Sequence, residues 1–538
     1  MKAENLWRRS WLSFLCALMP LSGLAAAPAA PVIDTSKVAA ADRASPLAED
    51  WQRGAFIEIF VRGYKDSNGD GIGDLRGLTQ SLDYLRDLGI RGIWLMPVTR
   101  SQDHDHGYAV SDYRDIEPTY GSLSDFDDLL REAHARGIGV IFDYVVNHSA
   151  AANPIFADAS ASTGSRYRNW YVWREQAPAG WKIMGKDPWV STPTGAYLAQ
   201  FSQSMPDFNL LDAQVLAYHQ DNLRFWLNRG VDGFRFDAVT HLVEHGPDAW
   251  YDQPEDYALM NELRTVVDGY AHRYAVCEAT RNAVAYAAPT ACGAAFALDS
   301  GHLIVDAARG KRRAIKAIAN YFTTAPAGMA MMVSNHDLFA GERLWDQVGG
   351  DLAQYRLAAA TYLLQPGTPF IYYGEEIGMS AGPGLQGDPK LRTPMSWTAD
   401  PLHAGFSTAK PYRVVAANVA QQNVASQSAS PNSLLSHYKS LLALRNTYPS
   451  IAHGSYQSPM VAGRVMSYRR QLGGETALVV INYGLKPAKF KVQGLAADAS
   501  FRQVFPKAAG TPLAVAADGS AQVAVEAQSV QVYIHTSL

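Results

Sequence analysis

The chain has 538 residues, of which 48% are hydrophobic and 18% are charged, and its formal net charge is -4. This length exceeds one compact domain and leaves room for a barrel of about 250 residues with accessory parts. Because there is no basic excess, the composition argues against nucleic acid as a partner. The 12 Trp and 27 Tyr residues are compatible with a sugar-binding cleft, although large cores also use these residues.

The N-terminal segment predicts export. Lys2, Arg8 and Arg9 precede an apolar run from Trp11 to Leu24, and Ala25–Ala27 supply small residues for cleavage, as in a secretory signal peptide. We expect residues 1–27 to be removed, residues 28–50 to form a linker, and the protein to be secreted or periplasmic and free of the membrane. A membrane anchor is the alternative, but the apolar run is short for a bilayer span.

Strand-like and helix-like segments alternate through residues 51–451, the predicted catalytic domain. Eight short runs predict strands: Phe56–Val61, Gly92–Met96, Gly139–Phe142, Gly233–Phe236, Tyr274–Cys277, Ala295–Leu298, Met329–Val333 and Phe370–Tyr373. Apolar residues at three-and-four spacing predict helices between them, such as Leu78–Leu88, Asp125–Arg136, Gln214–Asn228, Leu352–Leu364 and Leu434–Tyr448. This α/β alternation favours a closed (β/α)8 TIM barrel over an open doubly wound sheet.

Two further parts complete the predicted architecture. Residues 149–209 follow the third strand, contain four Trp and show no clear helix, which predicts a small inserted subdomain. Residues 452–538 change to short alternating strands with Gly and Pro turns, which predicts a C-terminal antiparallel β-sandwich domain. We expect a monomer.

Two cysteines, Cys277 and Cys292, remain after loss of the signal segment. A pair of cysteines in an exported chain is able to form a disulfide. The predicted strands place these two towards opposite ends of neighbouring parallel strands, however, which is too far for a bridge. The strand pattern therefore favours two unpaired thiols.

Polar side chains follow several of the predicted strands. The third strand leads to Asp143, Asn147 and His148, the fourth ends in Arg235 and Asp237, the fifth is followed by Glu278, and the seventh by His336 and Asp337. In a parallel barrel these strand ends meet at one rim, where the chemistry of such folds takes place. A lone acidic residue there is more often a helix cap, but three acids on one rim point to catalysis.

Carboxyl groups of this kind suit the hydrolysis of a glycosidic bond. That reaction needs one carboxylic acid to protonate the leaving oxygen and one carboxylate to attack the anomeric carbon. Arg235, two residues before Asp237, lies on the same side of its strand and is expected to keep Asp237 ionised. Glu278, beside like charges, is expected to have a raised pKa and to stay protonated.

The same segments resemble the ordered sequence regions of the α-amylase family of glycoside hydrolases. The matching segments are Asp143–His148, Gly233–His241, Glu278 and Asn335–Asp337, with Met205–Asn209 and Gly367–Glu376 as two further regions. Each motif is short, but their common order is highly specific. The resemblance runs from about Phe56 to the C-terminus.

The resemblance implies a role for each matching residue. Asp237 would be the nucleophile, Glu278 the general acid/base and Asp337 the carboxylate that grips the sugar hydroxyls. The expected substrate-binding residues are Tyr108, His148, Arg235, His336, Asp105, His241 and Arg392. Apart from the resemblance, His148 and His336 are equally well read as structural histidines.

A loop after the first strand predicts a structural Ca²⁺ site. Asp66, Asn68, Asp70 and Asp74 place oxygen side chains at alternate positions around Gly71, although the EF-hand glutamate is missing. Many members of the family bind Ca²⁺ in such a loop, with the Ile72 carbonyl as a further ligand. An ordinary Gly-Asp-rich turn is the alternative. Asn147 resembles a ligand of a second calcium site, whose other ligands the sequence does not identify.

The resemblance leaves the substrate open between related groups. Ala238, where α-1,6-specific members carry Val, favours α-1,4 bonds, and export favours an α-amylase acting on starch-like glucans or maltooligosaccharides. Against this, the Asp66 loop, Asp105 and Arg392–Trp397 resemble exo-acting oligoglucosidases, and Thr240 replaces the Lys often found there in α-amylases. The runner-up is an exported α-glucosidase or a maltooligosaccharide transglycosylase. A catalytically inert sugar-binding relative is disfavoured because all three acids are present.

Overall fold

The structure, a computed structural model, describes residues 33–42, 44–507 and 512–537. The predicted signal peptide, 1–27, lies outside these residues. The described part of the predicted linker has no regular structure up to the short η1 (Trp51–Arg53), and it lies against the barrel. Val38 and Ala41 donate their N–H groups to Asp221 and Asn228 of α6 (Ala213–Arg229).

The eight predicted strands form a closed parallel barrel, as expected. In barrel order they are β1 (Phe56–Ile59), β13 (Thr368–Tyr372), β12 (Met329–Met331), β11 (Ala295–Phe296), β10 (Tyr274–Cys277), β9 (Gly233–Asp237), β5 (Gly139–Val145) and β2 (Gly92–Leu95). Aromatic side chains fill the interior, where Phe56 stacks on Phe370 at 4.6 Å and Trp94 on Phe296 at 5.2 Å between ring centroids. The barrel is therefore a packed core rather than a pore.

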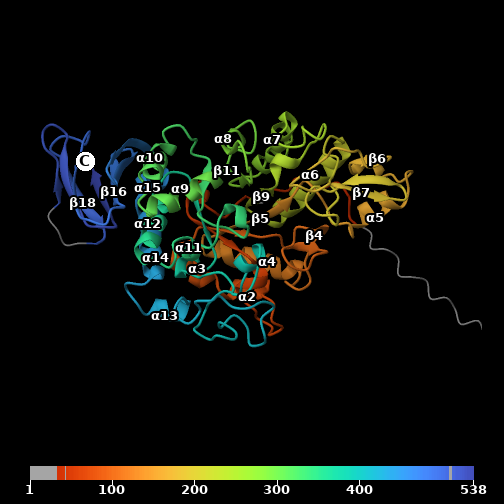
Figure 1. Cartoon of the computed structure of the whole chain (residues 1–538), viewed down its shortest axis with the longest axis horizontal. Helices are drawn as coiled ribbons and strands as arrows, with labels where there is room; N and C mark the ends of the chain where they lie inside the picture. The colour runs from red at the N-terminus through yellow and green to blue at the C-terminus, as the bar shows by residue number, and fades with distance from the viewer. Residues whose placement is uncertain (1–32, 43, 508–511, 538) are drawn as a thin grey trace, which may run out of the picture.

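Helices surround this barrel and connect its strands (Figure 1). They include α2 (Leu75–Gln80), α3 (Leu82–Leu88), α4 (Leu123–Ala135), α6, α7 (Pro254–Asp268), α8 (Ala283–Tyr286), α9 (Leu298–Ala308), α10 (Arg312–Tyr321), α12 (Leu352–Leu363) and α14 (Leu434–Thr447). Within the described residues, none of the helices combines the length and apolar character needed to cross a bilayer.

Local sequence signals fix where α6 ends and β9 begins. Asp212 accepts a hydrogen bond from the N–H of Gln214 at 2.8 Å and caps the helix, and Gly230, at φ 114°, ends it. Gly233 then opens β9 at φ 145°, where a Cβ atom would collide with the Tyr274 carbonyl oxygen. A glycine is thus required for β9 to pair with β10 in the register that aligns their catalytic ends.

The inserted segment after β5 is a small α+β subdomain. It contains a three-stranded sheet of β6 (Trp173–Arg174), β8 (Gly195–Leu198) and β7 (Trp189–Thr192). It also contains α5 (Pro154–Ala161), so the expectation of no helix there was wrong. Asn153 caps this helix and Pro154 opens it, a start signal that the dense aromatic residues further on obscured.

The C-terminal domain is antiparallel, as expected. Its main sheet runs β14 (Ser455–Ala462), β15 (Val465–Leu472), β16 (Glu475–Asn482), β21 (Ser529–Thr536), β18 (Ser500–Phe505) and β19 (Leu513–Ala514). A pair of strands, β17 (Ala488–Val492) and β20 (Ala521–Val525), packs on this sheet through a buried apolar cluster. In Figure 1 this domain lies at the opposite end of the molecule from the inserted subdomain.

The expectation that Cys277 and Cys292 stay unpaired was wrong. They form a disulfide, with 6.1 Å between their Cα atoms. The error lay in the register, because Cys277 pairs with Ala295, so β11 begins level with the end of β10. Cys292, three residues before Ala295, therefore lies beside Cys277, and the bridge fixes the residue that immediately precedes Glu278.

Candidate active site

Arg235 is the centre of a buried cluster of charges at the C-terminal rim of the barrel. Its guanidinium contacts Asp143 at 2.6 Å and Asp237 at 2.5 Å through Nη1, and Glu278 at 2.7 Å through Nη2. These residues come from β5, β9 and the end of β10, which are adjacent in the barrel. The structure thus brings together Asp237 and Glu278 as the sequence predicted, on either side of one cation.

The two carboxyl groups have different pKa values. Burial raises the pKa of Glu278 to about 7; Arg235 opposes this, while the charges of Asp237 and Asp337 add to it. Burial also raises the pKa of Asp237 to about 6, against the attraction of Arg235. The sequence predicts that Arg235 keeps Asp237 ionised, and Arg235 does lower the pKa of Asp237. Because Arg235 is shared among three carboxylates, burial outweighs this effect, and the pKa of Asp237 stays below that of Glu278 by only a small margin.

The backbone after Asp237 is held in an uncommon conformation. Ala238 adopts the left-handed region at φ 50° and ψ 36°, which costs a non-glycine residue free energy. Its N–H donates a hydrogen bond to Glu278 Oε2 at 3.0 Å. The strained turn therefore positions the carboxyl group of Glu278 beside the end of β9.

Asp337 is bound to two cations. His336 Nε2 lies 3.0 Å from one of its oxygens and Arg392 Nη2 lies 2.9 Å from the other. Burial works to raise the pKa of Asp337, but the charges of His336, Arg392 and Arg235 outweigh it and hold that pKa well below its usual range. The other ring nitrogen of His336, Nδ1, lies 2.5 Å from Glu58 Oε1. Burial lowers the pKa of His336, but the charges of Asp337 and Glu58 outweigh this effect and raise that pKa to about 10.

Tyr108 and His148 border the same cluster. The Tyr108 hydroxyl donates a hydrogen bond to Asp143 at 2.8 Å, lies 2.7 Å from His336 Nε2, and its ring stacks on that of His336. His148 is buried, burial lowers its pKa to about 3, and its Nε2 has no hydrogen-bond partner among the described residues. A neutral imidazole with an open ring nitrogen suits a substrate hydroxyl.

A pocket of about 520 Å³ opens beside Glu278. Its aromatic lining consists of Phe201, His241, Trp250, Tyr251 and Phe339. The His241 ring lies 4.8 Å from that of Tyr251, and its Nδ1 contacts Gln200 at 3.1 Å. This mixture of aromatic faces and polar groups is suited to a sugar. The sequence predicted His241 as a member of the site, and the structure places it here.

On the Asp337 side, ion pairs connect distant loops. Arg392 joins Asp337, Arg413 donates to the Arg392 carbonyl at 3.0 Å, and the other end of the Arg413 guanidinium contacts Asp105 at 2.9 Å. Asp105 is thus the last residue in this series of contacts, where it pairs with Arg413 rather than with Asp237 or Glu278. Asp388, 3.6 Å from Arg392, adds a further negative charge.

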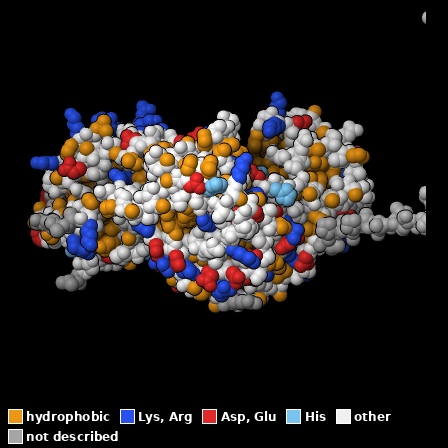
Figure 2. All heavy atoms as spheres, turned by 90° about the horizontal axis from the view of Figure 1, so that it is seen from below, with side chains coloured by type: hydrophobic (Ala, Val, Ile, Leu, Met, Phe, Trp, Pro, Cys, Tyr) orange, Lys and Arg blue, Asp and Glu red, His pale blue; other side chains and the backbone are white. Residues whose placement is uncertain are grey.

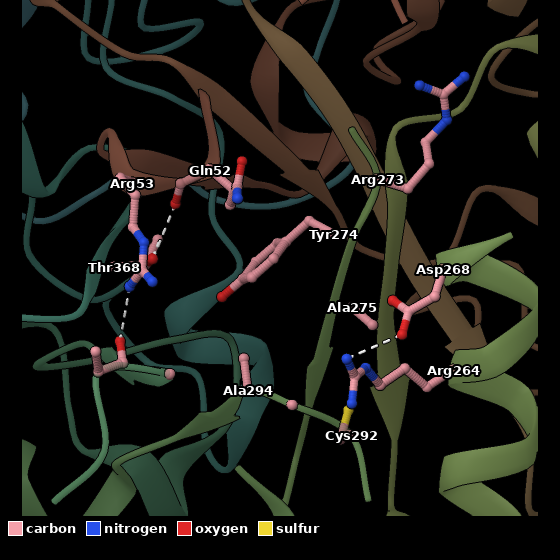
Figure 3. Close-up of a pocket in the computed structure, with 13 residues that line it drawn as sticks. Gln52, Arg53, Arg264, Asp268, Arg273, Tyr274, Ala275, Cys292, Ala294 and Thr368 are labelled. Atoms are coloured by element: carbon pink, nitrogen blue, oxygen red, sulfur yellow. Dashed lines mark hydrogen bonds and ion pairs between the residues drawn. The ribbon is translucent and has the colours of Figure 1, made fainter. Parts of the chain in front are cut away.

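Another pocket lies at the opposite end of the barrel (Figure 3). Its lining includes Tyr274 and Thr368, at the starts of β10 and β13, and Arg53 just before β1. Figure 3 shows Arg264 in this pocket turned toward Asp268, 2.9 Å away. The N-terminal end of a parallel barrel serves stability rather than chemistry, and the catalytic cluster is absent from this lining.

The Asp66 loop is closed by its own hydrogen bonds. The Asp66 oxygens accept the N–H groups of Asn68, Gly69 and Gly71 and the hydroxyl of Ser407, and Asp74 caps α2 through Gly77. Asp74 also accepts hydrogen bonds from the N–H and hydroxyl of Ser67. Asp66 and Asp74 are therefore both buried and occupied, and of the predicted ligands the exposed Asn68 and Asp70, with the Ile72 carbonyl, fit a cation better. Oxygen donors alone are what Ca²⁺ prefers.

Asn147 lies in a different buried polar group. Its side chain is hydrogen-bonded to Asp207, and burial raises the pKa of Asp207 to about 8. Gln200 also contacts Asp207, and its side-chain amide donates a hydrogen bond to the His241 carbonyl at 3.1 Å. Over the described part of the chain, no three His, Cys, Asp or Glu side chains are grouped to hold a metal ion.

Several members of the site were missed from the sequence. Glu58 had a signal, because an acidic residue inside an otherwise apolar strand needs a buried partner. Trp94 looked like ordinary core, yet Arg235 lies over its ring at 5.2 Å. Arg413 and the aromatic pair Trp250 and Tyr251 lie in loops without any regular pattern.

Fold and site together define a carbohydrate-active barrel enzyme, and comparisons with known proteins agree. A family model described as "Alpha amylase, catalytic domain" matches residues 58–454. The chain is 33% identical to Alpha-amylase 3 of Dictyoglomus thermophilum over 449 residues, covering 81% of this chain and 85% of that protein. It is 30% identical to Probable oligo-1,6-glucosidase 3 of Bacillus subtilis over 514 residues, covering 83% and 93%. The chain belongs to the α-amylase family of glycoside hydrolases.

Solved structures give the same fold. The α-amylase from H. orenii superimposes with a TM-score of 0.76 at 31% identity, covering 90% of this chain and 99% of that chain. A trehalulose synthase superimposes with a TM-score of 0.77 at 27% identity, covering 91% and 100%. Relatives with different names thus share one architecture, which leaves the substrate to be decided by the site.

The pKa values predict a bell-shaped dependence of kcat/KM on pH. With Asp237 as nucleophile and Glu278 as acid, as the sequence predicts, activity would need Asp237 ionised and Glu278 protonated. It should then fall below about pH 6 and above about pH 7. Initial rates at low substrate concentration across pH 4 to 9 would measure both limbs. Replacing Glu278 by Gln should remove the alkaline limb from the residual activity, and a plateau extending to pH 9 in the unaltered enzyme would contradict the assignment of the acid.

Proposed function

We propose that this chain is a retaining exo-α-glucosidase that removes single glucose units from the non-reducing ends of α-1,4-linked glucooligosaccharides. The observation that carries this proposal is the asymmetry of the cleft. On the Asp337 side, the ion pairs Asp337–Arg392 and Arg413–Asp105 are joined by a hydrogen bond from Arg413 to the Arg392 carbonyl. We infer that these linked loops close that side of the cleft to all but one sugar ring. The pocket beside Glu278 is open on the leaving-group side.

The chemistry follows from the two carboxyl groups. Asp237 attacks the anomeric carbon while the bond to the leaving oxygen breaks, and that oxygen takes the proton of Glu278. The ionised Glu278 then removes a proton from water, which displaces Asp237 and releases a sugar of retained configuration. Asp337, held ionised by His336 and Arg392, is suited to bind two sugar hydroxyls.

Ala238 supports the preference for α-1,4 bonds. It follows Asp237, donates its N–H to Glu278 and lines the pocket beside Glu278. We infer that the size of its side chain limits how the next sugar approaches the carboxyl groups. A β-branched residue at φ 50° would also add strain to the turn.

An endo-acting α-amylase is the second candidate. It is favoured by the identity to an α-amylase of Dictyoglomus thermophilum and by the predicted export, because long glucans are met outside the cell. We propose a secreted or periplasmic location for either activity, on the basis of the signal-like segment 1–27.

The products formed from a long α-1,4-glucan over time separate the two candidates. We expect glucose as the first and main product, since one ring fits beyond the cleaved bond, and a slow fall in chain length. Chromatography of the early products would measure this. Early mid-length oligosaccharides would instead establish the endo activity.

Two substitutions should separate the roles of the carboxyl groups. Glu278→Gln should lower turnover of maltose by about a hundred- to ten-thousandfold, because the leaving oxygen is no longer protonated. Turnover of α-glucosyl fluoride, whose leaving group needs little protonation, should be largely restored. Asp237→Asn is the matched control and should remain inactive on both substrates. Equal losses in both variants would refute the division of roles.

We also propose that the Asp66 loop binds a structural Ca²⁺, remote from the catalytic carboxylates. A ligand that binds only the folded state stabilises it by about 2.7 kcal/mol at a hundredfold excess over Kd. Chelation should therefore lower the melting temperature while initial rates at low temperature persist, and Asp70→Ala should abolish that shift. Immediate loss of turnover on chelation without a change in melting temperature would contradict this proposal.

A further inference from the structure

The disulfide between Cys277 and Cys292 closes a loop of chain that begins at the expected acid. The two cysteines are 15 residues apart, and the first residue that the bridge encloses is Glu278. Residues 278–282 form a loop at the rim of the barrel, in which Arg281 lines the pocket beside Glu278. The enclosed chain then forms α8 and returns to Cys292. The covalent ring therefore contains both the acid and part of the wall of its pocket.

This bridge lies at the shortest pairing of β10. Within the described barrel, β10 pairs with β9 at four positions but with β11 at only one, where Cys277 lies beside Ala295. β11 itself has two residues, and its pairing with β12 covers two positions. A parallel ladder this short supplies few hydrogen bonds. The disulfide thus adds a covalent link where the ladder contributes least, one residue before Glu278.

The other end of the bridge is fixed by its own surroundings. The Cys292 N–H donates a hydrogen bond to the Tyr286 carbonyl, the last residue of α8, at 3.0 Å. The Tyr286 ring stacks on Tyr257 of α7 with 4.3 Å between the ring centroids, and its hydroxyl donates to the Val239 carbonyl at 3.3 Å. Cys292 is therefore anchored to packed helices, and the bridge transmits that position to Cys277.

Glu278 is otherwise held from one side. Its Oε2 accepts the N–H of Ala238 at 3.0 Å, and its Oε1 contacts Arg235 at 2.7 Å. Its own N–H donates to the Phe236 carbonyl at 2.9 Å. These three partners lie in β9 or directly after it, whereas the bridge reaches Glu278 from the side of β11. Placement matters because a shift of about 1 Å at a reacting group costs up to about a hundredfold in rate.

We propose that the Cys277–Cys292 disulfide is a positioning element of the general acid, which keeps the Glu278 carboxyl group directed at the leaving oxygen. Both cysteines belong to the apolar core between the barrel and its helices, so the bridge acts through the backbone of Glu278 rather than on the substrate. The proposal rests on the proposed function, because it takes Glu278 as the acid. Opening the bridge should impair protonation of the leaving group more than attack by Asp237.

The ratio of kcat/KM for α-glucosyl fluoride to kcat/KM for maltose measures this dependence, because fluoride leaves with little protonation. Cys277→Ala, Cys292→Ala and the double variant should each raise the ratio about ten- to a hundredfold, through loss of activity on maltose. Since the bridge is one unit, the double variant should lose no more than either single variant. Partial unfolding leaves the ratio unchanged, because both substrates are measured on the same preparation.

Two controls separate positioning from stability. Leu441→Ala removes a buried side chain from α14, which packs on α3 and α12, and should lower the melting temperature without changing the ratio. Dithiothreitol opens the bridge of the unaltered enzyme without any substitution and should raise the ratio as the variants do. The same treatment should leave the ratio of the double variant unchanged.

The outcomes separate this inference from the assignment of the acid. Glu278→Gln must itself raise the ratio; equal losses on both substrates would show that Glu278 is not the acid and would refute the proposed function. If Glu278→Gln raises the ratio but the cysteine variants and the reduced enzyme do not, the bridge serves stability alone and the inference is overturned.

Discussion

The active site depends on one buried guanidinium. Arg235 is fully buried and contacts Asp143, Asp237 and Glu278, while Trp94 lies against its face. A buried charge is tolerated only when partners compensate it, and removal of one partner leaves the others costly. The barrel meets this condition by ending three adjacent strands at the same height. The register of β9 against β5 and β10 is therefore an electrostatic requirement as much as a packing one.

The balance of charge around this arginine explains how Glu278 keeps a proton near neutral pH. Five carboxyl groups, Glu58, Asp143, Asp237, Glu278 and Asp337, face three cationic groups, Arg235, His336 and Arg392. Asp337 is bound to His336 and Arg392, so the excess negative charge falls on the Arg235 side. Burial and this excess raise the pKa of Glu278 above that of Asp237. The same excess favours the positive charge that develops on the sugar in the transition state.

Sequence reasoning predicted the parts of the molecule that follow local rules. The eight strands were found because buried parallel strands are short apolar runs, and the three acids were found because strand ends converge. It failed where spacing through folded loops decides the outcome. The Cys277–Cys292 bridge depends on β11 starting level with the end of β10. The residues around Ala295 form no pattern from which that register could be predicted. Arg413 meets Asp105 across 308 residues of chain, a contact for which no periodic pattern exists.

The division between barrel and loops also explains why the fold alone does not decide the substrate. An α-amylase and a trehalulose synthase superimpose on this chain with TM-scores of 0.76 and 0.77, although they are named for different reactions. What they share is the barrel that orients the carboxyl groups. What distinguishes members must lie in the loops, and here the loops differ on the two sides of the cleaved bond. On one side of the carboxyl cluster, Arg392 and Arg413 link Asp337 to Asp105, whereas aromatic and exposed apolar side chains line the pocket beside Glu278. On the face seen in Figure 2, by contrast, acidic and basic side chains intermingle. We therefore expect the choice among related α-glucosides to be decided by the contacts that these loops make within the cleft.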